Sequence, residues 1–112
     1  LYNAFVELKK ENLMTVYVVQ EPKGINIVSA TKYGDIEIVL PATEHITFET
    51  EGVVEKIKNK LKNITEDDYL LLLGDPAAIG IATYFALKTN KRCQFLKWDR
   101  QEKMYYVVEV AV

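Results

Sequence analysis

The sequence predicts a single compact α/β domain: a mixed sheet with a βαβ core and a C-terminal antiparallel hairpin. One observation is a run of four leucines at 70–73, between two segments of helical periodicity. Such a run cannot alternate between a buried and an exposed face, so the strand it forms is covered on both sides, as in βαβ units. The other observation is that the last two strand-like segments are joined by a turn too short for a crossover. They must therefore pair antiparallel.

The composition is that of an ordinary soluble globular domain. The chain has 112 residues, a formal net charge of -2 and 49% hydrophobic residues. This balance excludes a disordered acidic tail, a collagen-like repeat and a basic arm that wraps nucleic acid. No apolar run is long enough to form a membrane helix, and the opening residues are not signal-like. Cys93 and His45 are the only residues of their types, which excludes an internal disulfide and a four-ligand zinc site.

The first half of the chain is expected to form mainly strands. Residues 1–13 are an N-terminal extension that could form a short helix, and the domain covers 14–112. Strands are expected at 15–19 and 36–40, where β-branched residues cluster between turn signals. A weaker strand is expected at 25–28. Another is expected at 45–49, where polar and apolar residues alternate.

Helical spacing of apolar residues predicts two helices in the second half, at 52–63 and 76–89. The first is amphipathic, with Thr50 as its N-cap and the 56–62 lysines on its solvent side. Asp67 and Asp68 precede the leucine strand and are expected to be solvated turn residues. Asp75 is the expected N-cap of the second helix, with Pro76 at its first position. Strands at 93–98 and 104–110 complete the hairpin.

The turn around Gly74 is the strongest local candidate for a ligand site. Glycine turns between a buried strand and a helix N-terminus bind anions in α/β proteins, which makes Gly74, Asp75 and Ala77 candidate ligand-binding residues. The alternative is an ordinary capped turn, because Asp75 places a negative charge where a phosphate would lie and Pro76 removes an N–H donor. No catalytic motif occurs, and neither His45 nor Cys93 has a partner in a motif. We therefore expect no catalytic residue, no metal and no cofactor.

The 95–106 hairpin combines aromatic and cationic residues, a mixture that can stack on bases and hold phosphates. An ordinary half-buried hairpin has the same composition, with its aromatic side chains inward and its cations outward. Acidic and basic segments alternate along the chain, so the hairpin and the 56–62 lysines could also meet in one basic patch. The candidate nucleic-acid residues are Lys97, Trp98, Arg100, Lys103 and Tyr105.

Ala78, Ala82 and Ala86 recur every four residues on a helix that is apolar on almost all sides. Such a helix needs two partners, which are the sheet and either residues 1–13 or a second copy of the protein. The stripe is therefore a candidate interface. A protein partner or self-association is expected, nucleic acid is an alternative, and no membrane binding is expected.

Several short blocks resemble a small family of proteins encoded by tailed bacteriophages, over about residues 14–112. The most specific are Gly74-Asp75-Pro76-Ala77-Ala78-Ile79-Gly80 and Leu96-Lys97-Trp98-Asp99-Arg100. The resemblance implies a phage context, in the cytoplasm of an infected host cell, and carries over no catalytic residue. Three functions stay open: an accessory protein that acts by protein binding, a nucleic-acid-binding module, and a small α/β enzyme with its site near Gly74 and Asp75.

Overall fold

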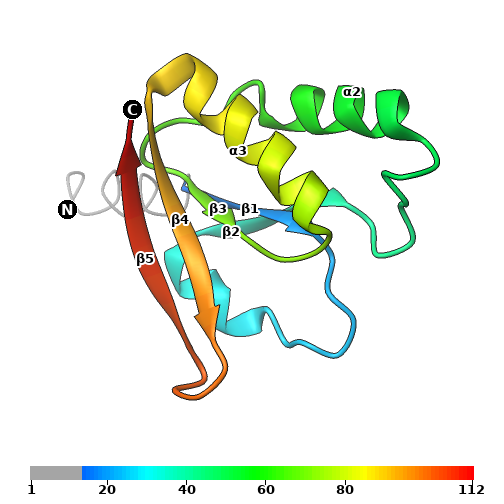
Figure 1. The fold of residues 1–112 in the computed structure, drawn as a ribbon. Helices are drawn as coiled ribbons and strands as arrows, with labels where there is room; N and C mark the ends of the chain where they lie inside the picture. Colours follow the sequence, from blue (N-terminus) through cyan, green and yellow to red (C-terminus); the bar gives the residue numbers. More distant parts are fainter. Residues whose placement is uncertain (1–13) are drawn as a thin grey trace, which may run out of the picture.

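The computed structural model describes residues 14–112, in which five strands form one mixed sheet in the order β2-β1-β3-β4-β5 (Figure 1). Strands β1 to β4 are parallel, and β5 runs antiparallel to β4. In chain order the elements are β1 (Thr15–Gln20), the 3-10 helix η1 (Val28–Tyr33), β2 (Asp35–Leu40), α2 (Thr50–Leu61), β3 (Tyr69–Leu71), α3 (Pro76–Asn90), β4 (Arg92–Asp99) and β5 (Met104–Ala111). The predicted α/β fold, its βαβ core and its C-terminal hairpin are confirmed.

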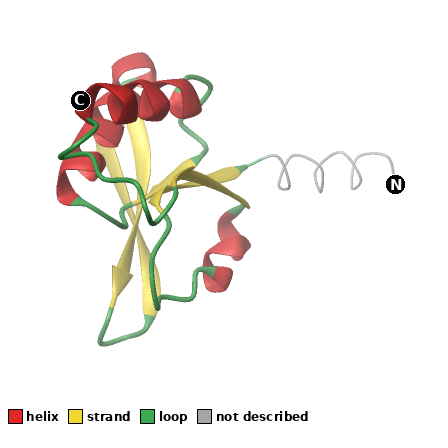
Figure 2. Ribbon diagram, turned by 90° about the vertical axis from the view of Figure 1, so that its right-hand side faces the viewer, coloured by secondary structure: helices red, strands yellow, loops and turns green. Residues whose placement is uncertain are grey.

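The two faces of the sheet are covered unequally (Figure 2). Helices α2 and α3 pack on one face, where Val53 and Ile57 of α2 join Val19 and Leu70 in the larger core. The short η1 covers part of the other face, where Ala30 packs with Val16 and Leu96 in a smaller core. The β4–β5 hairpin extends beyond the rest of the sheet, because β3 pairs only with residues 94–96 of β4.

Two predicted strands are wrong. Residues 25–27 form a loop and Val28 begins η1, and Ile25 and Val28 are 36% and 65% exposed. Here the Asn26 side chain accepts a hydrogen bond from the Val28 N–H (2.8 Å), which favours a turn over a ladder. Residues 45–49 form a turn in which the N–H of Phe48 and that of Glu49 both donate to the His45 carbonyl. Local hydrogen bonds of this kind replace the ladder that the alternating pattern suggested.

The start of α2 also differs from the prediction. Glu49, not Thr50, is the N-cap, and its side chain makes no capping hydrogen bond. The Thr50 hydroxyl instead donates to the carbonyl of Ile46 at 2.7 Å, which ties the first turn of α2 to the preceding loop. The expected helix over 1–13 lies outside the described residues. In residues 14–112, no helix has the length and hydropathy needed to cross a bilayer.

Candidate functional site

The carboxyl ends of β1 and β3 form the position where open α/β sheets usually bind ligands, since the strand order reverses between them. Here one buried side chain, Gln20, occupies that position and is 8% exposed. Its Nε2 donates to the Glu44 carbonyl (3.0 Å) and the Pro41 carbonyl (3.3 Å). Its Oε1 accepts from the N–H of Asp75 at 2.9 Å. Gln20, at the end of β1, therefore joins the loops that follow β2 and β3.

The turn at Gly74 fits closely against Gln20. Gly74 has a φ of +109°, and a Cβ atom there would lie 2.3 Å from the Gln20 Cβ. Asp75 is the N-cap of α3, as predicted, and its Oδ1 accepts from the Ala77 N–H at 2.8 Å. The N–H groups of Asp75 and Ala77, which a bound anion would need, are thus already hydrogen-bonded within the protein.

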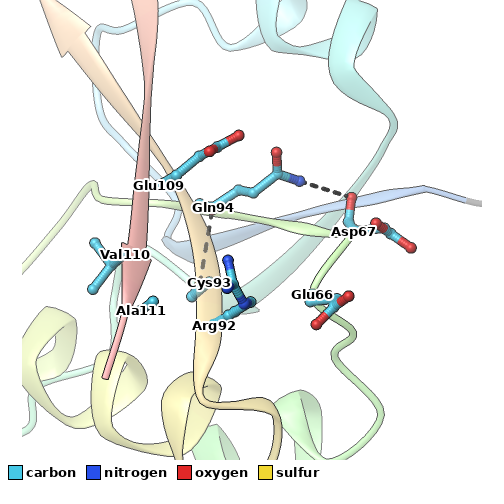
Figure 3. Close-up of a pocket in the computed structure, with 8 residues that line it drawn as sticks. All are labelled: Glu66, Asp67, Arg92, Cys93, Gln94, Glu109, Val110 and Ala111. Carbon is cyan, nitrogen blue, oxygen red and sulfur yellow. Dashed lines mark hydrogen bonds between the residues drawn. The ribbon is translucent and has the colours of Figure 1, made fainter.

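A cavity of about 330 Å³ lies at the opposite end of the sheet, around the amino ends of β3 and β4 (Figure 3). Its only cationic lining residue is Arg92, against three acidic residues. The Gln94 side chain crosses one wall and donates to the carbonyl of Asp67 at 3.2 Å. Among the described residues, no group of three or more His, Cys, Asp or Glu side chains could hold a metal ion. The lining residues are Glu66, Asp67, Arg92, Cys93, Gln94, Glu109, Val110 and Ala111.

Cys93 is the one side chain in this lining that could act as a nucleophile, but it is buried, at 3% exposure. Burial raises the pKa of its thiol to about 11, and the negative charge of Asp68 adds to the effect. Because the thiolate is the reactive form, the Cys93 side chain is a neutral thiol at physiological pH and a poor nucleophile.

We predict that native protein reacts with Ellman's reagent at pH 8 at least about tenfold more slowly than an unfolded control. Since the raised pKa disfavours the thiolate, the reaction should accelerate with pH up to about 11. The measurement is absorbance of the released thiol in buffer and in guanidinium. Equal rates in both would show that Cys93 is accessible and ionised.

Asp68, next to this cavity, is not the solvated turn residue that the sequence predicted. It is 6% exposed, and its Oδ1 accepts from the N–H of Thr15 at 2.9 Å. Its Oδ2 accepts from the N–H of Thr65 at 2.9 Å and from the Thr65 hydroxyl at 3.1 Å. The carboxylate thus joins the start of β1 to the loop before β3 and has a structural role.

The candidate nucleic-acid residues of the hairpin lie on different faces of the sheet. Trp98 and Tyr105 are cross-strand neighbours with ring centroids 4.8 Å apart, and Tyr105 is only 3% exposed. Both lie on the η1 face, whereas Lys97 pairs with Tyr106 on the α3 face. Arg100 and Lys103 lie in the connecting turn.

The 56–62 lysines are distant from this hairpin. They lie on α2 and at its C-cap, Lys62, and α2 packs over the edge strand β2, at the other side of the sheet from β5. Lys60 forms an ion pair with Glu37 of β2 at 2.9 Å, and Lys56 pairs with Glu44. The two basic segments therefore do not form one patch.

The alanine stripe of α3 faces the core. Ala78, Ala82 and Ala86 are at most 1% exposed and belong to the core that α2 and the sheet share. Helix α2 supplies the second partner that an apolar α3 requires. Tyr84, at 58% exposure, is the one large apolar residue of α3 that is mostly exposed, and the others are partly buried.

Strand β5 combines an open edge with exposed apolar side chains. In the described part of the chain, β5 is the last strand of the sheet and pairs only with β4. Four of its apolar side chains are 41–43% exposed: Met104, Tyr106, Val107 and Val108.

The direction of the β5 backbone groups follows from two hydrogen bonds. The Val112 N–H donates to the carbonyl of Lys91 (2.9 Å), and the Leu72 N–H donates to that of Leu96 (3.2 Å). Antiparallel ladders alternate hydrogen-bonded and non-hydrogen-bonded pairs. Alternate β5 residues therefore direct their N–H and C=O groups away from β4, and these are Tyr105, Val107, Glu109 and Ala111.

Comparison with known proteins places the chain in a family. Residues 14–112 match the family model described as phage Pam3 gp32-like protein. The chain belongs to this family. The match covers the same residues over which the sequence resembled a phage family, so that prediction is confirmed. Neither the curated proteins nor the solved structures contain a match.

Sequence reasoning identified β5 of this Pam3 gp32-like protein as a strand, with Tyr105 as a candidate nucleic-acid residue, but not its edge as a candidate protein-binding site. A signal was present, because Met104–Ala111 contains one charged residue, Glu109, and no proline or lysine. Edge strands usually carry such residues as protection against pairing with other chains. The signal has meaning only once the strand order shows that β5 lies at an edge.

Proposed function

We propose that this phage protein is an accessory protein that acts in the cytoplasm of the infected host cell by binding another protein, with β5 as the binding strand. The observation that supports this most is the open edge of β5 with its four half-exposed apolar side chains. An extended segment added to such an edge gains main-chain hydrogen bonds, while alternate side chains provide specificity.

The other two functions are less well supported by the geometry. A ligand near Gly74 and Asp75 has little room, because Gln20 fills the crevice and bonds to the Asp75 N–H. A nucleic acid on the hairpin would meet Lys97 on one face and Trp98 on the other, with Tyr105 buried. Stacking requires accessible rings beside the cations.

The substitution Val107→Pro tests the role of the β5 edge. Proline removes one N–H donor, and the Val107 N–H points away from β4, so the ladder within the protein keeps its hydrogen bonds. The tagged protein is used to capture partners from phage-infected host extract, and each captured protein is then purified and its affinity measured by calorimetry. We expect Val107→Pro to weaken that affinity at least about tenfold.

Phe48→Ser is the matched control, because Phe48 is 83% exposed and lies outside β5. It should bind as the wild type does. Circular dichroism establishes that both variants are folded. A captured partner that binds Val107→Pro and the wild type equally contradicts the proposal, and so does binding that Phe48→Ser abolishes while Val107→Pro retains it.

A further inference from the structure

We infer that the strand that pairs with β5 is β5 of a second copy, in an antiparallel two-fold arrangement centred on Val107. This inference rests on the proposed function and names its partner. Two five-stranded sheets would then join into one continuous sheet.

Backbone parity permits this arrangement. A two-fold axis perpendicular to the sheet pairs each β5 residue with a residue of the second copy that lies on the same face. Residues on one face are two positions apart, so the centre of the pairing must be a residue that pairs with itself. Val107 directs its N–H and C=O outward, so Val107 of the two copies can exchange two hydrogen bonds. The same register pairs Tyr105 with Glu109 of the second copy, and both of these also direct their backbone groups outward. Each of these hydrogen-bonded pairs thus uses backbone N–H and C=O groups that are not bonded to β4.

Side-chain contacts favour the same register. On the α3 face it places Tyr106 opposite Val108 of the second copy, and Met104 opposite Val110. On the η1 face it places Val107 opposite itself. Aromatic and β-branched cross-strand pairs of this kind stabilise antiparallel sheets. The four side chains of β5 that are 41–43% exposed all gain an apolar neighbour.

Charge excludes one alternative register and supports an antiparallel pairing. Glu109 is the only charged residue of β5. A register centred on Glu109 would oppose two like charges, whereas the register centred on Val107 places Glu109 opposite Tyr105.

The two ends of the hairpin also carry opposite charge. The tip carries three cations, Lys97, Arg100 and Lys103, against Asp99 and Glu102. Around its base lie Glu66, Asp67 and Glu109 against Lys91 and Arg92. Antiparallel pairing of β5 with itself places the basic tip of each copy beside the base of the other, where Glu109 is the acidic residue that lies on β5 itself. A second copy provides this charge complementarity twice, because the two-fold axis places each hairpin tip beside the base of the other copy.

A reciprocal charge exchange at residue 107 tests the inference. Val107→Lys and Val107→Glu each place like charges opposite one another in the two-fold pair, while an equimolar mixture places Lys opposite Glu. Because a single strand pair buries less area than a standard interface, the dimer is expected to be weak, and sedimentation is measured from about 1 to about 500 μM. The wild type should dimerise as concentration rises, each variant alone should stay monomeric, and the mixture should regain the dimer.

Phe48→Lys is the control, since Phe48 is 83% exposed and lies just before α2, which packs over β2 at the opposite edge of the sheet from β5. It should dimerise as the wild type does. A wild type that is monomeric throughout overturns the inference, and so does a mixture that stays monomeric while the wild type dimerises. Circular dichroism establishes that each variant is folded. Amide exchange of β5 in the unmodified protein tests the same pairing without any substitution. If the protein does not dimerise, this inference fails, and the proposed function is tested separately by the affinity of Val107→Pro for the captured partner.

Discussion

We expect Gly74→Ala to lower the free energy of unfolding by about 3 kcal/mol. Gly74 has a φ of +109°, which strains any residue with a Cβ, and its Cβ position lies 2.3 Å from the Gln20 Cβ. The clash displaces Gln20, whose side chain bonds to the loops after β2 and β3. Urea unfolding followed by the fluorescence of Trp98, the single tryptophan, measures the loss.

Gly80→Ala is the matched control for this prediction. Gly80 lies within α3, and a Cβ there would meet no atom within 4 Å. Alanine is the better helix former, so this variant should be more stable than the wild type by up to about 1 kcal/mol. The two Gly→Ala changes should therefore have opposite signs. A Gly74→Ala protein as stable as the wild type would show that the crevice adapts to a side chain.

The second large effect is expected for Asp68→Ala, which removes about 3 kcal/mol of stability. The buried carboxylate accepts hydrogen bonds from the N–H of Thr15 and from both the N–H and hydroxyl of Thr65. Alanine removes this buried acceptor, 6% exposed in the wild type, and leaves the partly buried N–H groups of Thr15 and Thr65 without their partner, which is costly. The change should loosen the start of β1, which urea unfolding detects as a lower midpoint.

Asp67→Ala provides the comparison, because Asp67 is adjacent in sequence but exposed. Its carbonyl accepts from Gln94 and its N–H donates to Thr65, and alanine retains both backbone groups. This variant should differ from the wild type by less than about 0.5 kcal/mol. Equal losses in the two variants would assign the effect to net charge rather than to the buried hydrogen bonds of Asp68.

The sequence predicted the elements whose signals are local. Asp75 and Pro76 define the start of α3 within one turn, and the leucine run marks a strand covered on both faces. The four-residue turn after Asp99 identifies the hairpin, because the Asp99 carboxylate accepts from the N–H groups of Gln101 and Glu102. Local signals of this kind can be recognised in the sequence without any knowledge of the tertiary structure.

The remaining features depend on contacts between distant parts of the chain. Gln20 contacts residues 21, 24 and 55 positions away, and no local pattern predicts that a glutamine will close the crevice. Likewise, the exposure of β5 follows from a strand order that a list of strands does not contain. The candidate binding strand was therefore recognisable only after the fold was known.

Amide hydrogen exchange of β5 tests most directly whether its open edge binds another strand. The N–H groups of Tyr105, Val107 and Glu109 point away from β4, whereas those of Tyr106 and Val108 bond to it. We predict that the outward amides become protected as protein concentration rises, with little change at the inward ones. Outward amides that exchange rapidly at every concentration, and also with a captured partner present, would contradict the account.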